Sequence, residues 1–164
     1  MLILNLLLAP LGAAAVWSLR FMRSEFGAVE KLVSYLVVVT AIEQTHSAVI
    51  DNLKLLAVEP TFGAFSAFKI CQLLLFPVIV MWLRFALFHP KAHAGVKALF
   101  FVCGFAVLPG AFGLLSRAGA LTLSDWNAWY ASGIWAVVLT IASAFGIGFG
   151  KLLRKGVRHD PVSS

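Results

Sequence analysis

Five long runs of apolar residues, nearly free of charged side chains, limit what this chain can fold into. Charged residues are 12% of the 164 residues, about half the ~25% of a soluble domain. A soluble domain of this length has too little volume to bury so much apolar surface, and a helix that crosses a bilayer needs about 20 mostly apolar residues. The runs therefore predict an all-α, polytopic transmembrane helical bundle, with spans at about 1–19, 32–52, 68–88, 97–116 and 130–150.

The basic residues predict how the spans are oriented. Ten of the 13 lysines and arginines lie at or after the C-terminal ends of the first, third and fifth runs, and three lie elsewhere. Cytoplasmic loops carry the excess of Lys and Arg in membrane proteins. We therefore expect a bundle over residues 1–150 with its N-terminus outside, followed by a basic cytoplasmic tail at residues 151–164. The alternative is four spans, since the polar end of the second run also suits the membrane interface.

The tail carries four basic residues that suit an anionic lipid surface, namely Lys151, Arg154, Lys155 and Arg158. Each basic residue near such a surface contributes about 1 kcal/mol, so contact with lipid headgroups is one interpretation. The other is that the tail is only the signal that keeps this end inside. The expected location is a bacterial inner membrane, or a membrane derived from it, with the lipid bilayer as the first partner.

Small residues at four-residue spacing predict where the spans pack. They are Ala142, Gly146 and Gly150 in the fifth span, and Ala106 and Gly110 in the fourth. Small side chains let two helix backbones approach closely in lipid, where burial of apolar surface alone does not drive association. Packing within the chain is the favoured interpretation, and contacts within an oligomer are the alternative.

Three local signals refine the helices. Pro77 and Pro109 each lack a backbone N–H and are expected to bend the third and fourth spans. The stretch LTLSDWNAW, residues 121–129, is typical of a helix start. Ser124 or Asp125 is the expected cap, because a side-chain oxygen there accepts from the first free backbone amides.

The second span contains the residues that are most costly in lipid. An ionised side chain at the centre of a spanning helix costs roughly 2.5–3.5 kcal/mol. With a rotation of about 100° per residue, the polar residues of this span gather on one face, while the opposite face stays apolar. The polar face holds Glu43, His46, Ser47, Asp51 and Lys54.

Three interpretations of this face remain open. The first is a structural network that pairs Glu43 with His46, and Asp51 with Lys54 or with Lys69 of the third span. The second is a path for protons or ions, with Glu43 and His46 as titrating groups. The third is a metal or haem site, but the di-iron motif Glu-x-x-His occurs only once where two copies and two further glutamates are needed. No metal and no cofactor are therefore predicted.

Common catalytic motifs are missing from the sequence: there is no GxSxG, HExxH, P-loop or glycine-rich dinucleotide turn. We expect a non-enzymatic anchor or assembly subunit of a larger membrane complex, a class that includes proteins of viral or phage origin. Its partner is expected to be a second copy of the chain or another membrane or peripheral protein. The alternative is an oligomeric ion or proton channel, or holin-like pore, lined by the polar face. The basic residues that give the net charge of +6 lie where they would set the membrane topology, so we expect no nucleic acid as a partner.

Overall fold

The computed structural model of the chain describes residues 1–22, 27–88, 93–124 and 126–157, and nearly all of them are helical. Several helices continue directly into a short 3₁₀ or π turn, labelled η. The elements in chain order are α1 (Leu2–Ser18), η1 (Leu19–Phe21), α2 (Ala28–Ser47), η2 (Ala48–Asn52), β1 (Leu56–Val58), α3 (Phe62–Ile70), η3 (Cys71–Leu75), α4 (Phe76–Phe88), α5 (Ala94–Arg117), β2 (Leu121–Leu123) and α6 (Ala128–Val157).

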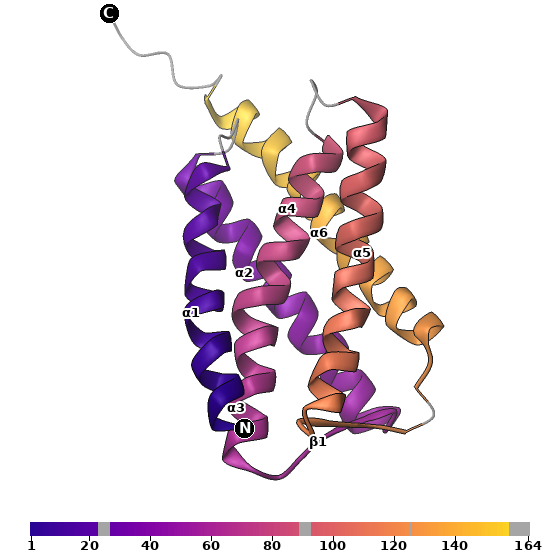
Figure 1. Ribbon diagram of the computed structural model, residues 1–164. Helices are drawn as coiled ribbons and strands as arrows, with labels where there is room; N and C mark the ends of the chain where they lie inside the picture. Colours follow the sequence, from indigo (N-terminus) through magenta and orange to yellow (C-terminus); the bar gives the residue numbers. More distant parts are fainter. Residues whose placement is uncertain (23–26, 89–92, 125, 158–164) are drawn as a thin grey trace, which may run out of the picture.

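Five of the helical segments are long and apolar enough to cross a membrane, which confirms the predicted number of apolar helices. The third is one continuous rod made of α3, η3 and α4. The N-terminus and the end of α6 lie at opposite ends of the bundle (Figure 1), as an odd number of crossings requires. Which end faces the cytoplasm stays a prediction.

The helices extend past several of the predicted bounds. The rod begins at Phe62 and α2 begins at Ala28, in both cases before the apolar run expected to span the bilayer. At the other end of the chain α6 continues to Val157, inside the predicted tail. Lysine, arginine and leucine are good helix formers, so the basic start of the tail continues the helix.

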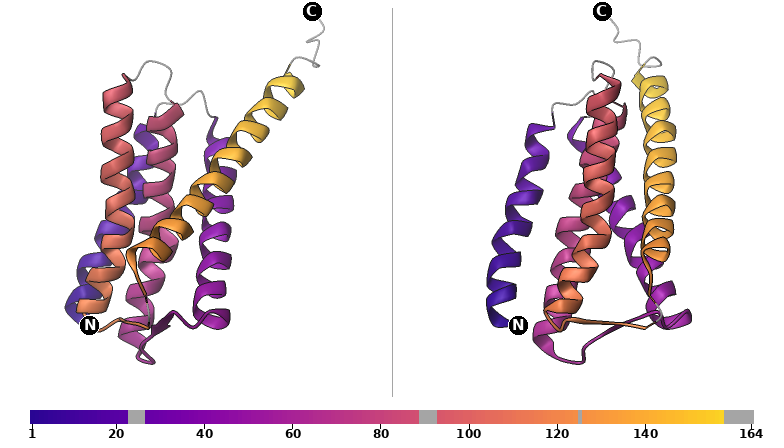
Figure 2. Two further views of the ribbon diagram at one scale, coloured as in Figure 1. Left: turned by 90° about the vertical axis from the view of Figure 1, so that its right-hand side faces the viewer. Right: turned by 45° about the vertical axis from the view of Figure 1, so that its right-hand side comes forward.

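The helices pack around the rod and α2. The first helix, α1, lies against α3 and η3 and exposes most of its side chains. The other helices share a common core, and α6 crosses the bundle obliquely (Figure 2). Trp135 of α6, Phe76 of α4 and Phe112 of α5 are among the largest fully buried side chains of this core.

A two-stranded ribbon closes the end of the bundle near the N-terminus. β1 and β2 pair in antiparallel register, with Leu56 opposite Leu123 and Val58 opposite Leu121. The ribbon joins the connection after α2 to the connection after α5. The C-terminal ends of α2 and α5 are therefore held together by the backbone hydrogen bonds of the ribbon.

The last helix begins inside the predicted stretch, at Ala128, but the predicted cap Ser124 is wrong because the ribbon uses that residue. The amide of Ser124 donates to the carbonyl of Leu55 at 3.0 Å, as part of the ribbon. The cap is instead Asn127, whose Oδ1 accepts from the amides of Trp129 at 2.9 Å and Tyr130 at 3.1 Å. Asp125, the other expected cap, lies outside the described residues.

The two prolines lie within helical segments. Pro109 is inside α5, which is continuous from Ala94 to Arg117. Pro77 is the second residue of α4, just after the π turn η3. Because proline has no amide hydrogen, the carbonyl of Leu73 loses its usual helical donor. The Tyr35 hydroxyl of α2 donates to this carbonyl at 2.6 Å, which satisfies it away from water.

Candidate functional site

The polar side chains of α2 point in two directions, most of them toward the surface and one toward the core. Val38, Ile42 and Val49, on the apolar face, are almost completely buried against the other helices. Glu43 is half-buried and Ser47 is exposed, so they lie on the outward side of α2. The predicted polar face therefore points away from the core of the chain, and only His46, at the edge of that face, turns inward.

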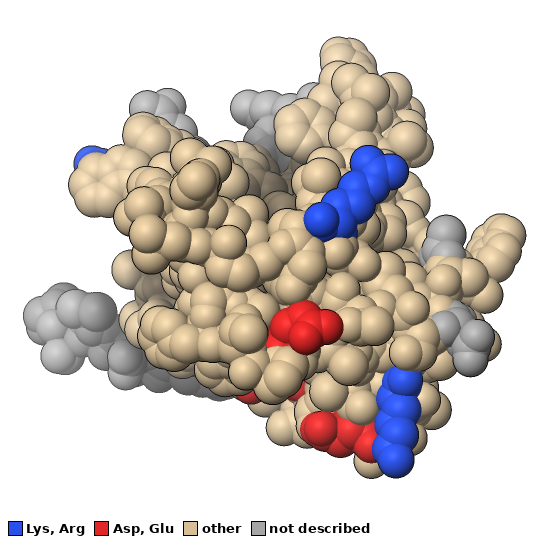
Figure 3. Space-filling model, turned by 60° about the horizontal axis from the view of Figure 1, so that its bottom comes forward, with Lys and Arg blue, Asp and Glu red and all other residues tan. Residues whose placement is uncertain are grey.

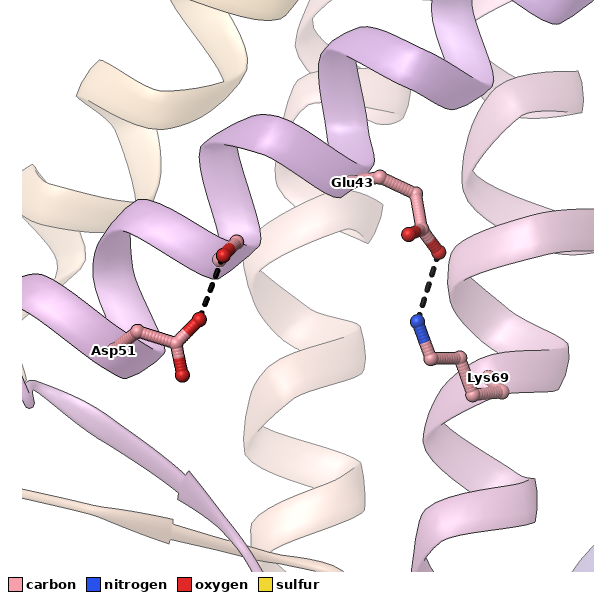
Figure 4. Close-up of polar contacts among 4 residues, drawn as sticks. Glu43, Asp51 and Lys69 are labelled. Atoms are coloured by element: carbon pink, nitrogen blue, oxygen red, sulfur yellow. Dashed lines mark hydrogen bonds and ion pairs between the residues drawn. The ribbon is translucent and has the colours of Figure 1, made fainter.

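Glu43 forms an ion pair with Lys69 of α3, with 2.8 Å between Oε1 and Nζ (Figure 4). The side chains are 38% and 32% exposed, respectively. Lys69 lies seven residues into α3, which places it about 10 Å from the start of that helix. The expected pairing of Glu43 with His46 is thus wrong: the rotation of α2 that buries its apolar face sends the two side chains to different sides.

Asp51 also has a different partner from the ones expected. Its Oδ2 accepts a hydrogen bond from the hydroxyl of Ser47, one turn earlier, at 2.6 Å (Figure 4). Neither Lys54 nor Lys69 pairs with Asp51 in the described part of the chain. Lys54 follows η2 with a φ of 52°, a conformation that turns the chain out of the helix, and its side chain is exposed.

We call Glu43, Ser47, Asp51 and Lys69 the outer polar cluster, because they lie toward the end of the bundle that carries the N-terminus. This end has a mostly uncharged surface with a few acidic and basic side chains (Figure 3). All four members are exposed or half-buried on the surface of the single chain. The cluster is therefore available for contact with something outside the bundle.

His46 lies inside an aromatic cage contributed by the rod and by α5 and α6. Its side chain is 2% exposed. The ring centroids of Phe68, Phe76, Phe112 and Trp135 lie 5.4 to 6.0 Å from that of His46, three of them in edge-on geometry. The sequence offered no signal for this cage, because its members come from distant segments and each alone is typical of any apolar helix.

A second group of polar residues, which the sequence analysis missed, joins α2 to α4 beside α6, toward the opposite end of the bundle. Arg84 of α4 donates from Nη1 to the hydroxyl of Ser34 at 3.3 Å, and its charge interacts with that of Glu30. Glu30 and Ser34 are buried. We call these three residues the inner polar cluster. A charged arginine between two helices is stabilised here by groups on α2.

The glycines predicted to pack in the last span contact this cluster. A Cβ atom on Gly146 would overlap the guanidinium of Arg84, and one on Gly150 would lie 3.5 Å from Oε1 of Glu30. Ala142, one turn before Gly146, is 2% exposed. The small residues of α6 therefore make room for charged side chains, where sequence reasoning expected another helix backbone.

The packing residues predicted in the fourth span are not used within the chain. Ala106 and Gly110 are exposed on α5, and a Cβ on Gly110 would meet no atom within 4 Å. The close contact is instead at Gly104, where a Cβ would overlap Leu83 of α4. α5 turns Leu108 and Phe112 toward the core, where they pack against the neighbouring helices.

The basic tail is only partly described. Lys151 is exposed on α6. Arg154 and Lys155 are within α6, but their side chains lie outside the description, as does all of Arg158. Contact of these residues with lipid headgroups stays a prediction.

Metal binding gains no support from the geometry. Within the described ranges, no three His, Cys, Asp or Glu side chains gather closely enough to share a metal ion. The Glu-x-x-His motif in particular does not form one site, because Glu43 points outward to Lys69 and His46 points into the aromatic cage.

The fold and its two polar clusters define a class: a bundle of five helices that are apolar enough to cross a bilayer, compatible with a membrane protein. Comparisons with protein families, with curated proteins and with solved structures found no match to this chain. The function is therefore argued from the geometry of the clusters.

Proposed function

We propose that the chain is a non-enzymatic, multi-pass subunit of a larger membrane assembly, and that it holds its partner through the outer polar cluster. The observation that carries this proposal is the outward direction of Glu43 and Asp51 on a helix whose apolar face is buried. Charged and hydrogen-bonding groups at membrane depth are costly against lipid tails. A partner helix that supplies hydrogen-bond donors would remove that cost and gain the specificity that polar contacts provide.

The arrangement of the core favours a subunit over a pore within one copy of the chain. At the depth of His46 the interior is filled by aromatic rings, and the charged members of the outer polar cluster lie outside it. The alternative is an oligomer in which several outer polar clusters face a common axis and line a path for ions or protons. Both assemblies cover the same face, but only the second conducts.

The connections explain why the partner is expected to meet the helices themselves. The described segment between η2 and α3 is short and is held in the ribbon with β2. It leaves little surface outside the membrane for recognition. In the proposed orientation the N-terminus and the ribbon lie outside, the tail lies in the cytoplasm of a bacterium against anionic lipid, and the partner is a second copy or another membrane or peripheral protein.

Site-specific photo-cross-linking tests the proposal. A photoreactive amino acid at Gln44, exposed beside Glu43, should give one discrete cross-linked product in intact membranes. Val102, exposed on α5, is the matched control and should give none. The product should weaken when Glu43→Leu is added. A ladder of self-cross-links together with ion flux through liposomes of the purified protein would favour the pore, and no product at Gln44 would contradict both.

A further inference from the structure

Several buried polar atoms in the core have no hydrogen-bond partner among the described residues. They include both ring nitrogens of His46, Oε1 of Gln72 and Nε1 of Trp135. His46 and Gln72 are each 2% exposed, and Trp135 is fully buried. Buried polar groups in native proteins nearly always have a partner, either protein or ordered water. Three such residues in one core need a common explanation.

His46 and Trp135 are in contact between α2 and α6, and Gln72 is a buried residue of η3 in the adjoining rod. The ring centroids of His46 and Trp135 are 5.8 Å apart. Gln72 lies midway along the rod between Phe68 and Phe76, and both of those rings contact the imidazole. In a regular α-helix, residues four apart diverge by about 40°. The π turn η3 has more residues per turn, so it brings positions 68, 72 and 76 closer to one line.

The orphaned atoms form a matched set of donors and acceptors. A neutral imidazole has one N–H donor and one nitrogen acceptor, the indole of Trp135 adds a donor, and the carbonyl oxygen of Gln72 adds an acceptor. No direct hydrogen bond joins these groups in the described part of the chain. Water both donates and accepts, so it can bridge all four atoms. Because the two nitrogens of His46 point in different directions, one water molecule cannot serve both.

We propose that His46, Gln72 and Trp135 form a buried hydration site that binds at least two water molecules and joins the second, third and fifth spans. The ligand is neutral, because the surrounding shell of Phe68, Phe76 and Phe112 disfavours an ion. It is small, because the side chains around it are themselves packed and buried. One water accepts from Trp135 and donates to His46, and another accepts from His46 and donates to Gln72. This site lies inside the bundle and is independent of the proposed docking face.

Water contacts of the Trp135 indole test the site directly. The full chain, labelled with ¹⁵N at tryptophan and held in detergent micelles, should show a cross-peak between the Trp135 Nε1–H and water in a rotating-frame Overhauser experiment. The Trp135→Phe variant assigns the resonance. The signal of Trp82, whose indole donates to Ser18 at 2.9 Å, should be the same in every His46 variant. No cross-peak from Trp135 in the unaltered protein would overturn the proposal.

Two substitutions at His46 give opposite results for a hydrated and a dry cage. If water fills the site, His46→Gln keeps a side chain that can hydrogen-bond to it. His46→Leu removes that group and leaves the polar atoms of Trp135 and Gln72 without a complete hydrogen-bond network. The Trp135 cross-peak should then persist in the first variant and vanish in the second, whose Tm should be lower by about 2–4 °C. In a dry cage, His46→Leu would remove an unpartnered polar group and raise the Tm instead. A persistent cross-peak in His46→Leu would also refute the site. If that variant fails to fold, the Trp135 cross-peak of the unaltered protein still tests whether the site holds water.

Discussion

We expect Gly146→Ala, which adds a single methyl group, to lower the stability of the bundle measurably. A single added Cβ would overlap the Arg84 guanidinium, so Gly146→Ala forces Arg84 out of its position between α2 and α6. The arginine would then lose its hydrogen bond to Ser34 and its attraction to Glu30. Glu30 is buried and would lose this nearby positive charge.

The expected magnitude combines two opposing effects. Leaving buried hydrogen-bonding groups without their partner costs about 1–3 kcal/mol, and more where a charge is involved. Arg84 is moved and not removed, and it is only partly buried, so we use about 3 kcal/mol for the loss of its interactions with both Ser34 and Glu30. Alanine is a better helix former than glycine by about 1 kcal/mol. The net loss in the free energy of unfolding is therefore about 2 kcal/mol, or roughly 4–8 °C in Tm.

Thermal unfolding in one detergent, followed by circular dichroism, provides the assay. Gly148→Ala is the matched control, because it lies on the same helix and a Cβ there meets no atom within 4 Å. That variant should be unchanged or slightly more stable. In an Arg84→Met background, Gly146→Ala should lose most of its effect, since the two residues are in contact. Equal stability of the two alanine variants would refute the assigned role of Gly146.

Three further predictions test other parts of the structure. Cysteines at Leu53 and His93, exposed at opposite ends of the bundle, should label from opposite sides of intact membranes; labelling from the same side would contradict the topology. Glu43→Leu leaves the Lys69 ammonium unpaired and should lower stability in detergent by about 1 kcal/mol relative to Glu43→Gln, and equal melting would show that the pair contributes nothing. Tyr35→Phe removes the donor to the carbonyl freed by proline and should cost about 1–2 kcal/mol, measured by the same melting; an unchanged Tm would show that the carbonyl is satisfied in another way.

The number of helices was predictable, because each apolar run is long enough to dominate its local structure. The direction of the polar face was not. Angles along α2 place Glu43 and Asp51 on one side, but they do not tell which side meets the other helices. That choice depends on how well Val38 and Ile42 pack against the other helices, and no single segment contains this information.

The inner polar cluster illustrates a second limit of the sequence. Arg84 lies near the end of its span, and an arginine there is usually interpreted as reaching the headgroups. In the structure Arg84 instead donates to Ser34 of α2, and its guanidinium fills the space beside Gly146. Such a contact needs a glycine on one helix and acceptors on another at the same depth. The ribbon was missed for a related reason: three alternating residues such as Leu121–Leu123 form a strand only because a partner strand lies beside them.

The two polar clusters together determine how α2 is rotated. Glu30 and Glu43 are 13 residues apart on α2, which separates them by about 20 Å along the helix. One interacts with Arg84 of α4 and the other pairs with Lys69 of α3, so α2 is joined to the same rod at two depths. A turn of α2 that hid Glu43 in the core would separate both pairs and bring a carboxylate against the aromatic cage, at the cost of burying a charge. The outer polar cluster is thus held on the surface by the rest of the fold, where the proposed partner, a second protein or a second copy, would cover it.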